Sequence, residues 1–453
     1  MAIQFGTDGV RGVAGAGLTC DTALKLGQAA ARCLAKSEGT GHKMLVGKDT
    51  RHSCDMLEAA LVAGICSMGA DVVRLGVIAT PGVAVLTERY GACAGFVISA
   101  SHNPYEHNGI KLFGESGRKL SDEQQQDIEA LLSEQALVPH YRTGTEIGRV
   151  EEMDRQADED YVAFLEKAAD VDLSHLSVII DAANGAAYQT ARLLAERLGL
   201  SATFLGVEPN GANINLDCGS TAPKRLVEAV RAQRADIGIA LDGDADRIIA
   251  VDERGNLVDG DQLLAIFAED YRKRGLLRGN TIVGTKISNL GLHKYCSERG
   301  IRLICTDVGD RYVLARMLED SLLLGGEQAG HIILRDYIET GDGQLVGVRL
   351  LSLLARSKKP LSQLASVMER YPQITINTKV SDETKKRYAK HPRYLEEREA
   401  VEEALKQNGR LLVRPSGTEP VLRVMVEAKT LEQAEAMAKR VAAVLQAIDE
   451  SAR

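Results

Sequence analysis

Tryptophan is absent from this chain of 453 residues, and aromatic residues make up only 4% of it. Proteins that grip single-stranded nucleic acid stack the bases on aromatic side chains, so a stacking platform is excluded. Basic residues are also in deficit, 55 against 63 acidic ones, which gives a formal net charge of -8. This balance argues against nucleic acid as a partner but leaves room for a local cationic pocket that binds a small anion.

Long apolar runs and paired cysteines are missing as well. No run approaches the ~20 residues that a membrane-spanning helix needs, and the first residues lack a basic segment followed by a hydrophobic stretch. The eight cysteines include no C-x-x-C pair, and several lie in apolar stretches such as residues 61–68. We therefore expect no membrane partner, a cytosolic location and reduced cysteines in the interior rather than zinc ligands or disulfides.

What the chain does contain is an internal repeat. Its length is roughly three times what one hydrophobic core serves, which predicts about three domains. Three stretches show the same order of strand, helix, strand, helix, strand and polar loop. The predicted strands are 43–47, 71–75 and 94–98; 177–181, 202–206 and 236–241; and 281–284, 302–305 and 322–325. Short apolar strands separated by helical patterns indicate α/β units.

Each repeat ends in a polar loop. The loops are Ser-Ala-Ser-His-Asn-Pro at 99–104, Asp-Gly-Asp-Ala-Asp-Arg at 242–247 and Gly-Glu-Gln-Ala-Gly-His at 326–331. In α/β sheets ligands bind outside the carboxyl ends of the strands, where all three loops lie. This shared position favours one functional site built from three loops, against the alternative of unrelated solvated turns.

The rest of the chain predicts a smaller C-terminal domain and gives the domain limits. A charged helical segment at 151–167 and a proline-bounded segment at 360–372 mark junctions. Beyond them we expect strands at 373–380, 410–414 and 421–427, with helices at 395–406 and 431–448. The predicted domains are 1–155, 156–255, 256–369 and 370–453, so the count rises from three to four.

Asp242, Asp244 and Asp246 place three carboxylates at alternate positions directly after a strand. Such like charges repel unless a cation joins them, and oxygen ligands suit Mg²⁺ or Ca²⁺ better than zinc. An EF-hand is excluded because Arg247 replaces the required glycine and the flanks are predicted strands. Two alternatives remain open: a dehalogenase-like phosphatase with Asp242 as nucleophile, and a solvated acidic turn.

Ser101 is the candidate nucleophile of the first loop. His102 follows it directly, and Lys111 comes ten positions later. A hydroxyl acts on phosphate only with a base to take its proton or cations to stabilise the developing charge. Alone, Ser101 would be interpreted as a turn residue, but the metal-type loop at the equivalent place of the next repeat favours function. His102 and His331 fit a structural role and an acid–base role equally well.

The C-terminal domain carries a loop suited to phosphate. Residues 414–420 read Arg-Pro-Ser-Gly-Thr-Glu-Pro, with Arg423 nearby. A guanidinium, two hydroxyls and a glycine with adjacent N–H groups can hold a phosphate dianion, although a proline-flanked surface turn is the alternative. Near the amino terminus, residues 5–12 form a glycine-rich segment that carries Arg11.

Four signatures in this order, at 99–104, 242–247, 326–331 and 414–420, resemble the α-D-phosphohexomutase superfamily over the whole chain. Residues 5–12, 309–313 and the exact form of the last loop are similar to its bacterial branch that acts on glucosamine phosphates. Relatives that act on mannose or glucose phosphates usually carry Arg-Ala-Ser-Asn-Thr-Glu-Pro instead. The resemblance implies an α/β fold, with three similar α/β domains of mixed sheets and a smaller C-terminal α+β domain around a central cleft.

The resemblance also implies an activity. The chain would be an isomerase that interconverts glucosamine 6-phosphate and glucosamine 1-phosphate through a phosphoserine and a hexosamine 1,6-bisphosphate, which serves as intermediate and activator. It would supply amino-sugar nucleotide and cell-wall precursor synthesis, with a small phosphosugar as partner and a homodimer suggested. A mutase for mannose or glucose phosphates, and a metal-dependent sugar-phosphate phosphatase, are the alternatives.

The roles that the resemblance implies can be assigned residue by residue. Ser101 would carry the phosphoryl group and, with Asp242, Asp244 and Asp246, hold Mg²⁺. Proton transfer and charge stabilisation would fall to Arg11, Lys111, Arg247 and His331. Substrate contacts would come from His102, Glu327, Arg414, Ser416, Gly417, Thr418 and Arg423. The family's sugar loop usually has serine where this chain has Ala329, a loss of one hydrogen bond worth about 0.5–1.5 kcal/mol, so fine sugar preference stays open.

Overall fold

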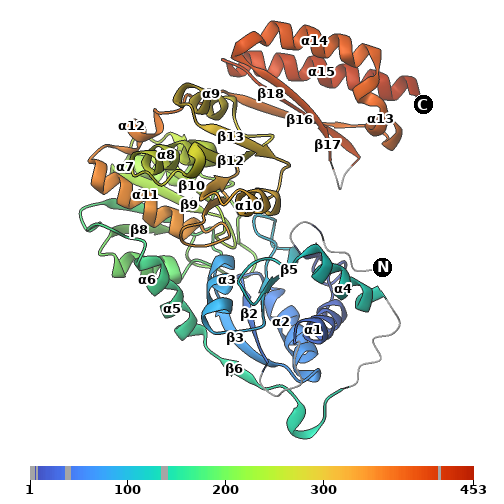
Figure 1. Cartoon of the computed structure of the whole chain (residues 1–453), viewed down its shortest axis with the longest axis vertical. Coiled ribbons are helices and arrows are strands. Elements are labelled where there is room, and N and C mark those ends of the chain that lie inside the picture. Colours follow the sequence, from blue (N-terminus) through green and yellow to red (C-terminus); the bar gives the residue numbers. More distant parts are fainter. Residues whose placement is uncertain (1–5, 7–8, 36–41, 134–140, 417–419, 453) are drawn as a thin grey trace. The chain divides into compact units, whose positions relative to one another are not determined.

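The computed structural model describes residues 6, 9–35, 42–133, 141–416 and 420–452 (Figure 1). They form two compact units. The first unit comprises Met1–Thr285 with Ile304–Ser366, and the second comprises Lys286–Leu303 with Val367–Arg453. Within this described part, no helix is both long and apolar enough to cross a membrane.

The first unit begins with a six-stranded sheet. Its order is β1 (Val10–Val13), β5 (His107–Gly114), β4 (Ala94–Ile98), β2 (Lys43–Lys48), β3 (Asp71–Val77) and β6 (Val150–Glu152). Strand β5 runs antiparallel to both of its neighbours, and the other pairings are parallel. The sheet is therefore mixed, with one reversed strand next to the strand that leads into the serine loop.

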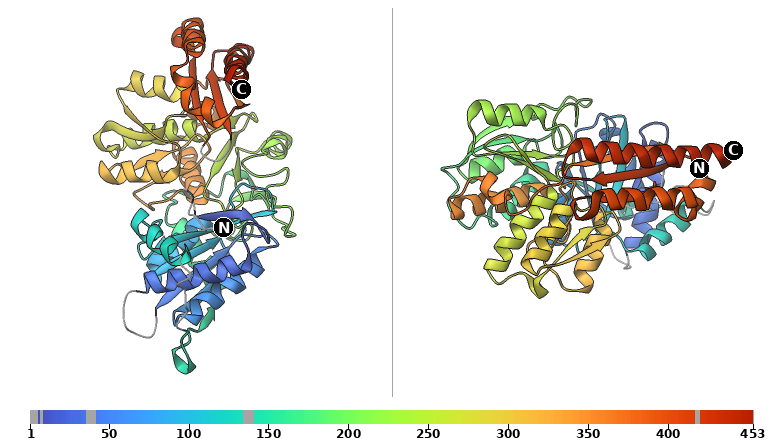
Figure 2. Two further views of the ribbon diagram at one scale, coloured as in Figure 1. Left: turned by 90° about the vertical axis from the view of Figure 1, so that its right-hand side faces the viewer. Right: turned by 90° about the horizontal axis from the view of Figure 1, so that it is seen from above.

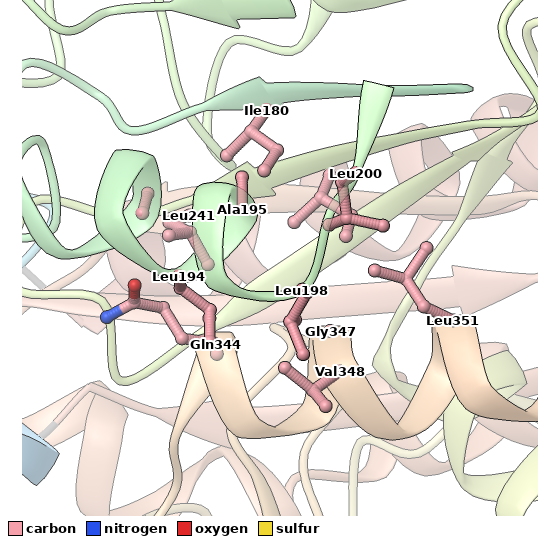
Figure 3. Close-up of a pocket in the computed structure, with 13 residues that line it drawn as sticks. Ile180, Leu194, Ala195, Leu198, Leu200, Leu241, Gln344, Gly347, Val348 and Leu351 are labelled. Atoms are coloured by element: carbon pink, nitrogen blue, oxygen red, sulfur yellow. The ribbon is translucent and has the colours of Figure 1, made fainter. Parts of the chain in front are cut away.

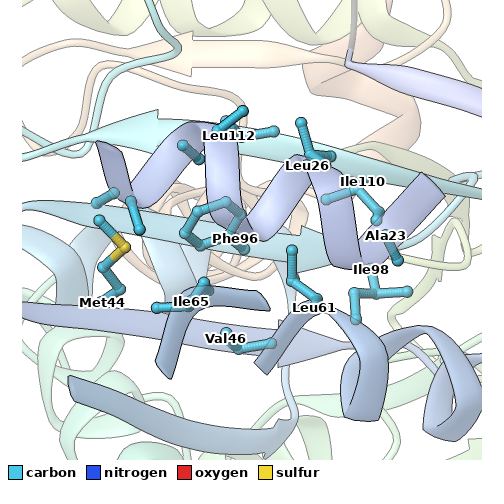
Figure 4. Close-up of a cluster of buried hydrophobic side chains, with 14 of the residues drawn as sticks. Ala23, Leu26, Met44, Val46, Leu61, Ile65, Phe96, Ile98, Ile110 and Leu112 are labelled. Carbon is cyan, nitrogen blue, oxygen red and sulfur yellow. The ribbon is translucent and has the colours of Figure 1, made fainter. Parts of the chain in front are cut away.

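Apolar side chains from two helices cover one face of this sheet. Residues of α1 (Cys20–Leu34) and α2 (Cys54–Ser67) pack on β2, β4 and β5, as Figure 4 shows; the buried contacts are made by Ala23, Leu26, Leu61, Ile65, Met44, Val46, Phe96, Ile98, Ile110 and Leu112. The two helices cross at glycines. A Cβ on Gly64 would lie 2.2 Å from the carbonyl oxygen of Leu24, and one on Gly27 would lie 2.5 Å from that of Leu61. Only glycine permits this close approach of the two backbones.

A second sheet follows in the order β11 (Leu257–Val258), β10 (Ile248–Asp252), β9 (Ile237–Leu241), β7 (Ser177–Asp181) and β8 (Ser201–Leu205). Strands β7, β8 and β9 are parallel, whereas β10 and β11 are antiparallel additions. The accompanying helices are α5 (Asp154–Glu166), α6 (Thr190–Arg197) and α7 (Lys224–Gln233). Every residue of β9 is buried, so the strand that leads into the three-carboxylate loop is firmly held.

The third sheet has the order β13 (Arg302–Thr306), β12 (Thr281–Thr285), β14 (Leu324–Gly326) and β15 (Ile332–Leu334). Strands β12 and β14 are parallel, and β15 turns back antiparallel. Its helices are α8 (Gly260–Lys273), α10 (Asp310–Glu319), α11 (Gly343–Ser357) and α12 (Leu361–Ala365), whereas α9 (Leu290–Arg299), between β12 and β13 in the sequence, belongs to the second unit. Where α11 meets α6 and the second sheet, apolar side chains leave a cavity of about 30 Å³ (Figure 3).

The three polar loops share one structural position. Each is the turn between a strand with a parallel neighbour and the antiparallel strand after it, namely β4 to β5, β9 to β10 and β14 to β15. The repeat predicted from the sequence is therefore confirmed, and each strand predicted for it is present within two residues. Of the reversed strands, β10 was predicted as a strand at 248–251, whereas β5 and β15 were not predicted.

The second unit contains a three-stranded antiparallel sheet in the order β16 (Gln373–Lys379), β18 (Val421–Glu427) and β17 (Arg410–Pro415). Helices α14 (Pro392–Leu405) and α15 (Leu431–Ala452) lie side by side and pack on it, and the short α13 (Asp382–Arg387) precedes them (Figures 1 and 2). Short 3₁₀ turns occupy Gly144–Glu146, Arg278–Asn280, Tyr388–Lys390 and Lys406–Asn408.

The fold is thus α/β, with mixed sheets in three similar parts and a smaller C-terminal α+β part. All eight cysteines are free thiols, as expected, and Cys54, Cys66, Cys218 and Cys296 are buried. Cys20 is exposed at the start of α1, so the prediction of an interior position is wrong for this residue.

Candidate active site

Ser101 lies in the turn between β4 and β5, and its side chain is buried. Its hydroxyl donates a hydrogen bond of 2.6 Å to Oδ2 of Asp242, which follows β9. The backbone of Ser101 has a φ of 52°, a left-handed conformation that non-glycine residues adopt at a cost. A strained residue at the meeting point of two loops requires a firm support.

That support comes from Asp49 and Arg51, which sequence reasoning missed. Arg51 donates from Nη2 to the carbonyl oxygen of Ser101 at 2.8 Å and from Nε to Asp49 at 2.8 Å. Ser99 donates its hydroxyl to the same Asp49 carboxylate at 2.6 Å and accepts from the Ser101 N–H at 2.9 Å. The signal was available, since residues 49–53 are polar and directly follow β2, a parallel neighbour of β4.

Asp242, Asp244 and Asp246 form a buried cluster in which one carboxylate oxygen from each lies within 4.8 Å of the others. Oδ1 of Asp244 and Oδ1 of Asp246 are buried without a hydrogen-bond partner. Three carboxylates with unused buried oxygens would repel one another without a cation. This donor set fits a hard divalent ion with oxygen ligands.

Two side chains from the first part of the chain donate to the cluster, and one of them carries a positive charge. Lys111, on β5, places Nζ 2.7 Å from Oδ2 of Asp244 and 3.4 Å from Oδ2 of Asp246, and its side chain is only 1% exposed. Thr80, at the start of α3 (Thr80–Arg89), donates its hydroxyl to Asp244 at 2.6 Å. Thr80 was not predicted from the sequence, because nothing in its neighbourhood distinguishes it from a helix-start residue.

The pKa values inside the cluster diverge. Burial, together with the charges of Asp246 and Asp244, raises the pKa of Asp242 well above its usual range. Burial opposes ionisation of Asp246 too, but Lys111, His331 and Arg247 outweigh it and hold the pKa of Asp246 well below its usual range. One carboxyl is thus poised to hold a proton and another is firmly ionised, as expected for like charges that share a site.

Arg247 and His102 lie beside the serine. Nη1 of Arg247 is 3.0 Å from Nδ1 of His102, and Nε is 3.7 Å from Asp246. Burial, followed by the charges of Arg247 and Arg11, lowers the pKa of His102 to about 4. His102 is therefore neutral near pH 7 and accepts the Arg247 hydrogen bond at Nδ1. Arg11 extends from β1, where it is paired with Gly109 of β5 and exposed.

The third loop brings His331 to the same cluster. Nδ1 of His331 lies 3.7 Å from Oδ1 of Asp246, and Nε2 accepts the N–H of Gly341 at 3.0 Å. A neutral His331 therefore carries its proton on Nδ1, facing the carboxylate. Burial opposes protonation of His331, but Asp246 outweighs it and the pKa is raised. Glu327 accepts the N–H of Gly309 at 2.9 Å, whereas Ala329 is exposed.

A cavity of about 490 Å³ adjoins His331 in the first unit. The Lys119–Asp310 ion pair lies in its wall, as do Thr340 and Glu339. Asp310 begins α10, and its Oδ2 lies 3.8 Å from Nε2 of His331. This space suits a polar ligand next to the imidazole.

The second unit holds the predicted phosphate loop. Arg414 on β17 is paired directly with Arg423 on β18. Burial, with the neighbouring charge of Arg423, lowers the pKa of Arg414. The N–H of Ser416 donates to Val421, and its carbonyl oxygen accepts from Lys385 at 2.9 Å. Paired guanidinium groups on adjacent strands favour a multivalent anion; Gly417 and Thr418 lie outside the described residues.

The structure thus brings the predicted residues together in two sets, one in each unit. The first unit gathers Ser101, His102, Lys111, Asp242, Asp244, Asp246, Arg247 and His331, with Arg11 and Glu327 at its edge. The second unit gathers Arg414, Ser416 and Arg423 on neighbouring positions of one hairpin. Their chemical roles remain predictions.

Comparison with known protein families gives a match for almost every part of the chain. Models for the phosphoglucomutase/phosphomannomutase α/β/α domains I, II and III match residues 2–138, 159–255 and 259–371. The model for the C-terminal domain of the same proteins matches residues 376–444.

Whole-length relatives agree. A phosphoglucosamine mutase of Pelotomaculum thermopropionicum is 49% identical over 449 residues, which covers 99% of this chain and 100% of that protein. A phosphoglucomutase/phosphomannomutase family protein of Burkholderia thailandensis has a solved structure with a TM-score of 0.78 at 25% identity, covering 98% of this chain and 97% of that one. The N-acetylphosphoglucosamine mutase of Aspergillus fumigatus, solved in complex with GlcNAc-6P and magnesium, shares the fold with a TM-score of 0.68 at 17% identity, covering 99% and 96%.

Proposed function

The chain belongs to the phosphoglucomutase/phosphomannomutase family, and from this premise we propose that it acts as a phosphoglucosamine mutase. This isomerase interconverts glucosamine 6-phosphate and glucosamine 1-phosphate and supplies amino-sugar nucleotide and cell-wall precursor synthesis. Identity of about half of all residues over nearly the full length supports glucosamine phosphates as substrates over the mannose or glucose alternative.

One observation carries the chemistry of the proposal. The Ser101 hydroxyl is buried, donates to Asp242 at 2.6 Å, and lies at the edge of a three-carboxylate cluster. In the proposed reaction phosphoserine 101 gives its phosphoryl group to the free hydroxyl of the sugar phosphate. The bond between phosphorus and the serine oxygen breaks, and a bond between phosphorus and the sugar oxygen forms. The hydroxyl proton moves to a base, and the product is the 1,6-bisphosphate.

The second half of the cycle reverses the first. The bisphosphate turns around, and its other phosphoryl group returns to Ser101, so that phosphate is conserved over the cycle. We assign charge stabilisation near Ser101 to Arg247, Lys111 and Arg11. Their guanidinium and ammonium groups can stabilise the negative charge as the phosphoryl group is transferred. His331, with its proton on Nδ1 toward Asp246, is our candidate for proton transfer.

Asp242, Asp244, Asp246 and an oxygen of phosphoserine 101 would hold Mg²⁺. The bound ion would polarise the phosphoryl oxygens and offset the charge of the three carboxylates. The buried Oδ1 atoms of Asp244 and Asp246, which accept no hydrogen bond, support this assignment. So does the magnesium bound to the fungal structural neighbour.

We assign substrate recognition to two sets of residues. Arg414, Ser416, Gly417, Thr418 and Arg423 would hold the phosphate that does not react, and Glu327 and His102 would contact the sugar. Either phosphate of the bisphosphate could bind to these phosphate-binding residues, and the reorientation of the bisphosphate requires this. Domain limits near residues 155, 255 and 369, and a homodimer, remain predictions that accompany the function.

The function is tested by substituting Ser101. We expect Ser101→Ala to lower mutase turnover by at least about 10³-fold, since the group that carries phosphate is lost. Intact mass should show a phosphorylated form of the native protein that the variant lacks. Ser366→Ala, at an exposed serine in a short connecting segment, is the matched control and should retain both properties.

Two further measurements separate the alternatives. A phosphatase would release inorganic phosphate from glucosamine 6-phosphate in steady state, whereas a mutase conserves it. Comparison of kcat/KM for glucosamine, glucose and mannose 1-phosphates decides the sugar. Full turnover by Ser101→Ala, or preference for glucose or mannose phosphate, would contradict the proposal.

A further inference from the structure

The first turn of α11 touches two parts of the candidate site at once. The N–H of Gly343 donates to the carbonyl oxygen of Ala245, in the middle of the three-carboxylate loop, at 2.9 Å. The N–H of Gly341 donates to Nε2 of His331 at 3.0 Å. This turn therefore contacts both the carboxylate loop and the imidazole.

At both contacts the backbone of the turn approaches its neighbours too closely for a side chain. A Cβ on Gly341 would lie 2.6 Å from atoms of the His331 ring, and a Cβ on Gly343 would lie 2.6 Å from the carbonyl oxygen of Arg247. Because the backbone approaches so closely, any shift of the turn moves the loop, the imidazole or both. Whatever fixes the turn also fixes the geometry of the site.

Asp342, between the two glycines, fixes the turn through both of its carboxylate oxygens. Oδ1 accepts the N–H of Leu345 at 2.9 Å and so caps α11. Oδ2 accepts the hydroxyl of Tyr161 at 2.8 Å. A cap alone needs one oxygen, which Ser or Asn would supply without burying a charge. Burial raises the pKa of Asp342 to about 7, so the protein maintains this carboxyl at a cost.

Tyr161 anchors the second oxygen from outside the third sheet. It is fully buried on α5, the helix that connects the first and second sheets along the chain. Its ring lies against α3 of the first part, because a Cβ on Gly82 would be 3.2 Å from Cδ1 of Tyr161. One hydroxyl thus links α5 and α3 to the start of α11.

We propose that Tyr161 and Asp342 are positioning residues that hold the first turn of α11, and through it the carboxylate loop and His331, in their working geometry. The hydrogen bonds of Asp342 join Tyr161 to the start of α11, and neither Tyr161 nor Asp342 was singled out by the sequence. The kinetic part of this inference rests on the proposed mutase function, whereas the geometric part concerns the carboxylate loop alone.

Tyr161→Phe tests the pair, because it removes only the hydroxyl and keeps the ring against Gly82. We expect kcat for glucosamine 1-phosphate to fall about tenfold while KM changes less than twofold, since the reacting groups shift and substrate contacts do not. The thermal unfolding midpoint should also need at least threefold more Mg²⁺ for its half-maximal rise, because the carboxylates are less well held.

Tyr90→Phe is the matched control. Tyr90 donates its hydroxyl to Asp160 at 2.7 Å, so this variant removes a bond of the same kind from the residue next to Tyr161 on α5. It should leave kcat and the Mg²⁺ response within twofold of the native protein. Should Tyr161→Phe fail to fold, Asp342→Asn, which keeps an oxygen for the Leu345 cap, is judged by the same criteria.

The outcomes separate the two proposals. A native Mg²⁺ response in Tyr161→Phe overturns the positioning role, and so does an equal loss of kcat in Tyr90→Phe. A weakened Mg²⁺ response in a protein whose native form shows no mutase activity supports the positioning role and refutes the function.

Discussion

The surroundings of Asp242 oppose the charged form of its carboxyl group. It is fully buried, it lies among two further carboxylates, and its pKa is raised well above the usual range by burial and by Asp246 and Asp244. A carboxyl whose pKa is higher in the folded state lowers stability as the pH rises from its unfolded-state pKa to its folded-state pKa. Without a cation, the carboxylate would therefore lower stability as the pH rises, and a bound cation would reverse this effect.

Asp242→Asn should separate these two effects. In EDTA we expect the unfolding midpoint to rise by about 2–4 °C, equivalent to about 1 kcal/mol, because the amide does not titrate. The gain should grow as the pH rises above about 4, where the unfolded-state carboxyl ionises, and level off once the native carboxyl has lost its proton; the stabilisation by Mg²⁺ should largely disappear. Differential scanning calorimetry in EDTA and in Mg²⁺ measures both.

The control is Asp181→Asn, at a buried carboxylate outside the cluster. Asp181 accepts the N–H groups of Ala183 and Gly219, so its substitution should lower stability and leave the Mg²⁺ response intact. A lower midpoint of Asp242→Asn in EDTA at pH 9 would show that the hydrogen bonds of the carboxylate outweigh charge repulsion at this site.

At the residue scale, the sequence predicted groups that stand within motifs and missed those that stand outside them. Ser101 lies in one recognisable loop, and the three aspartates lie together in another. Asp49, Arg51 and Thr80 reach the site only because β2 lies beside β4 and β3 lies beside β2 in the sheet. Their role depends on strand order, which a single sequence does not contain.

At the scale of elements, the strands of the repeat were predicted, and so was the reversed strand β10 at 248–251, whereas the reversed strand β5 was not. Strands β4 and β9 are wholly buried and read as continuous apolar runs. By contrast, β5 carries His107, Asn108 and Lys111, because it serves the site as well as the sheet. A functional strand departs from the apolar pattern that would identify it.

Glycines inside helices divide into those that the packing requires and those that it tolerates. Gly347 lies in the middle of α11 beside the cavity of about 30 Å³ (Figure 3). A Cβ there would meet only the side-chain ends of Ile239 at 3.3 Å and Ile248 at 3.7 Å. Gly347→Ala should therefore stabilise the protein by about 0.5–1 kcal/mol through helix propensity.

Gly64→Ala provides the opposite case on α2. Its Cβ would lie 2.2 Å from a backbone oxygen of α1, so the helices must separate, and we expect a loss of about 2 kcal/mol or more. Urea unfolding followed by circular dichroism compares both variants with the native protein. Destabilisation by Gly347→Ala would mean that the isoleucines cannot yield by a few tenths of an ångström.

At the scale of the whole molecule, the two compact units do not follow the order of the chain. Helix α9 lies between β12 and β13 in sequence but belongs to the second unit. Within that unit the side chain of Asn289 holds the backbone of Tyr371 through bonds of 2.9 and 3.0 Å. The sequence pattern assigned this helix to the third repeat, because a pattern records order along the chain and not packing.

Glu427 joins α9 to the C-terminal sheet. It is fully buried on β18, accepts Nε of Arg410 at 3.0 Å, and accepts the N–H of Leu290 at the start of α9 at 3.1 Å. Arg410 also donates to the carbonyl oxygen of Ser288 at 2.6 Å. A buried charge with these partners makes α9 and β17–β18 one cooperative body.

Glu427→Gln tests whether α9 and the β17–β18 hairpin unfold cooperatively. The amide cannot match a carboxylate that serves a guanidinium and a backbone N–H, so the second unit should lose up to about 3 kcal/mol. Hydrogen exchange followed by mass spectrometry should then quicken together in Leu290–Arg299 and in Arg410–Pro415, while α8 keeps its native protection. Glu402→Gln, which breaks an exposed pair with Arg398 on α14, should change neither segment. Faster exchange in β17 with unchanged exchange in α9 would contradict this coupling. It would mean that α9 is stabilised by the third repeat and that the cooperative body begins at Val367.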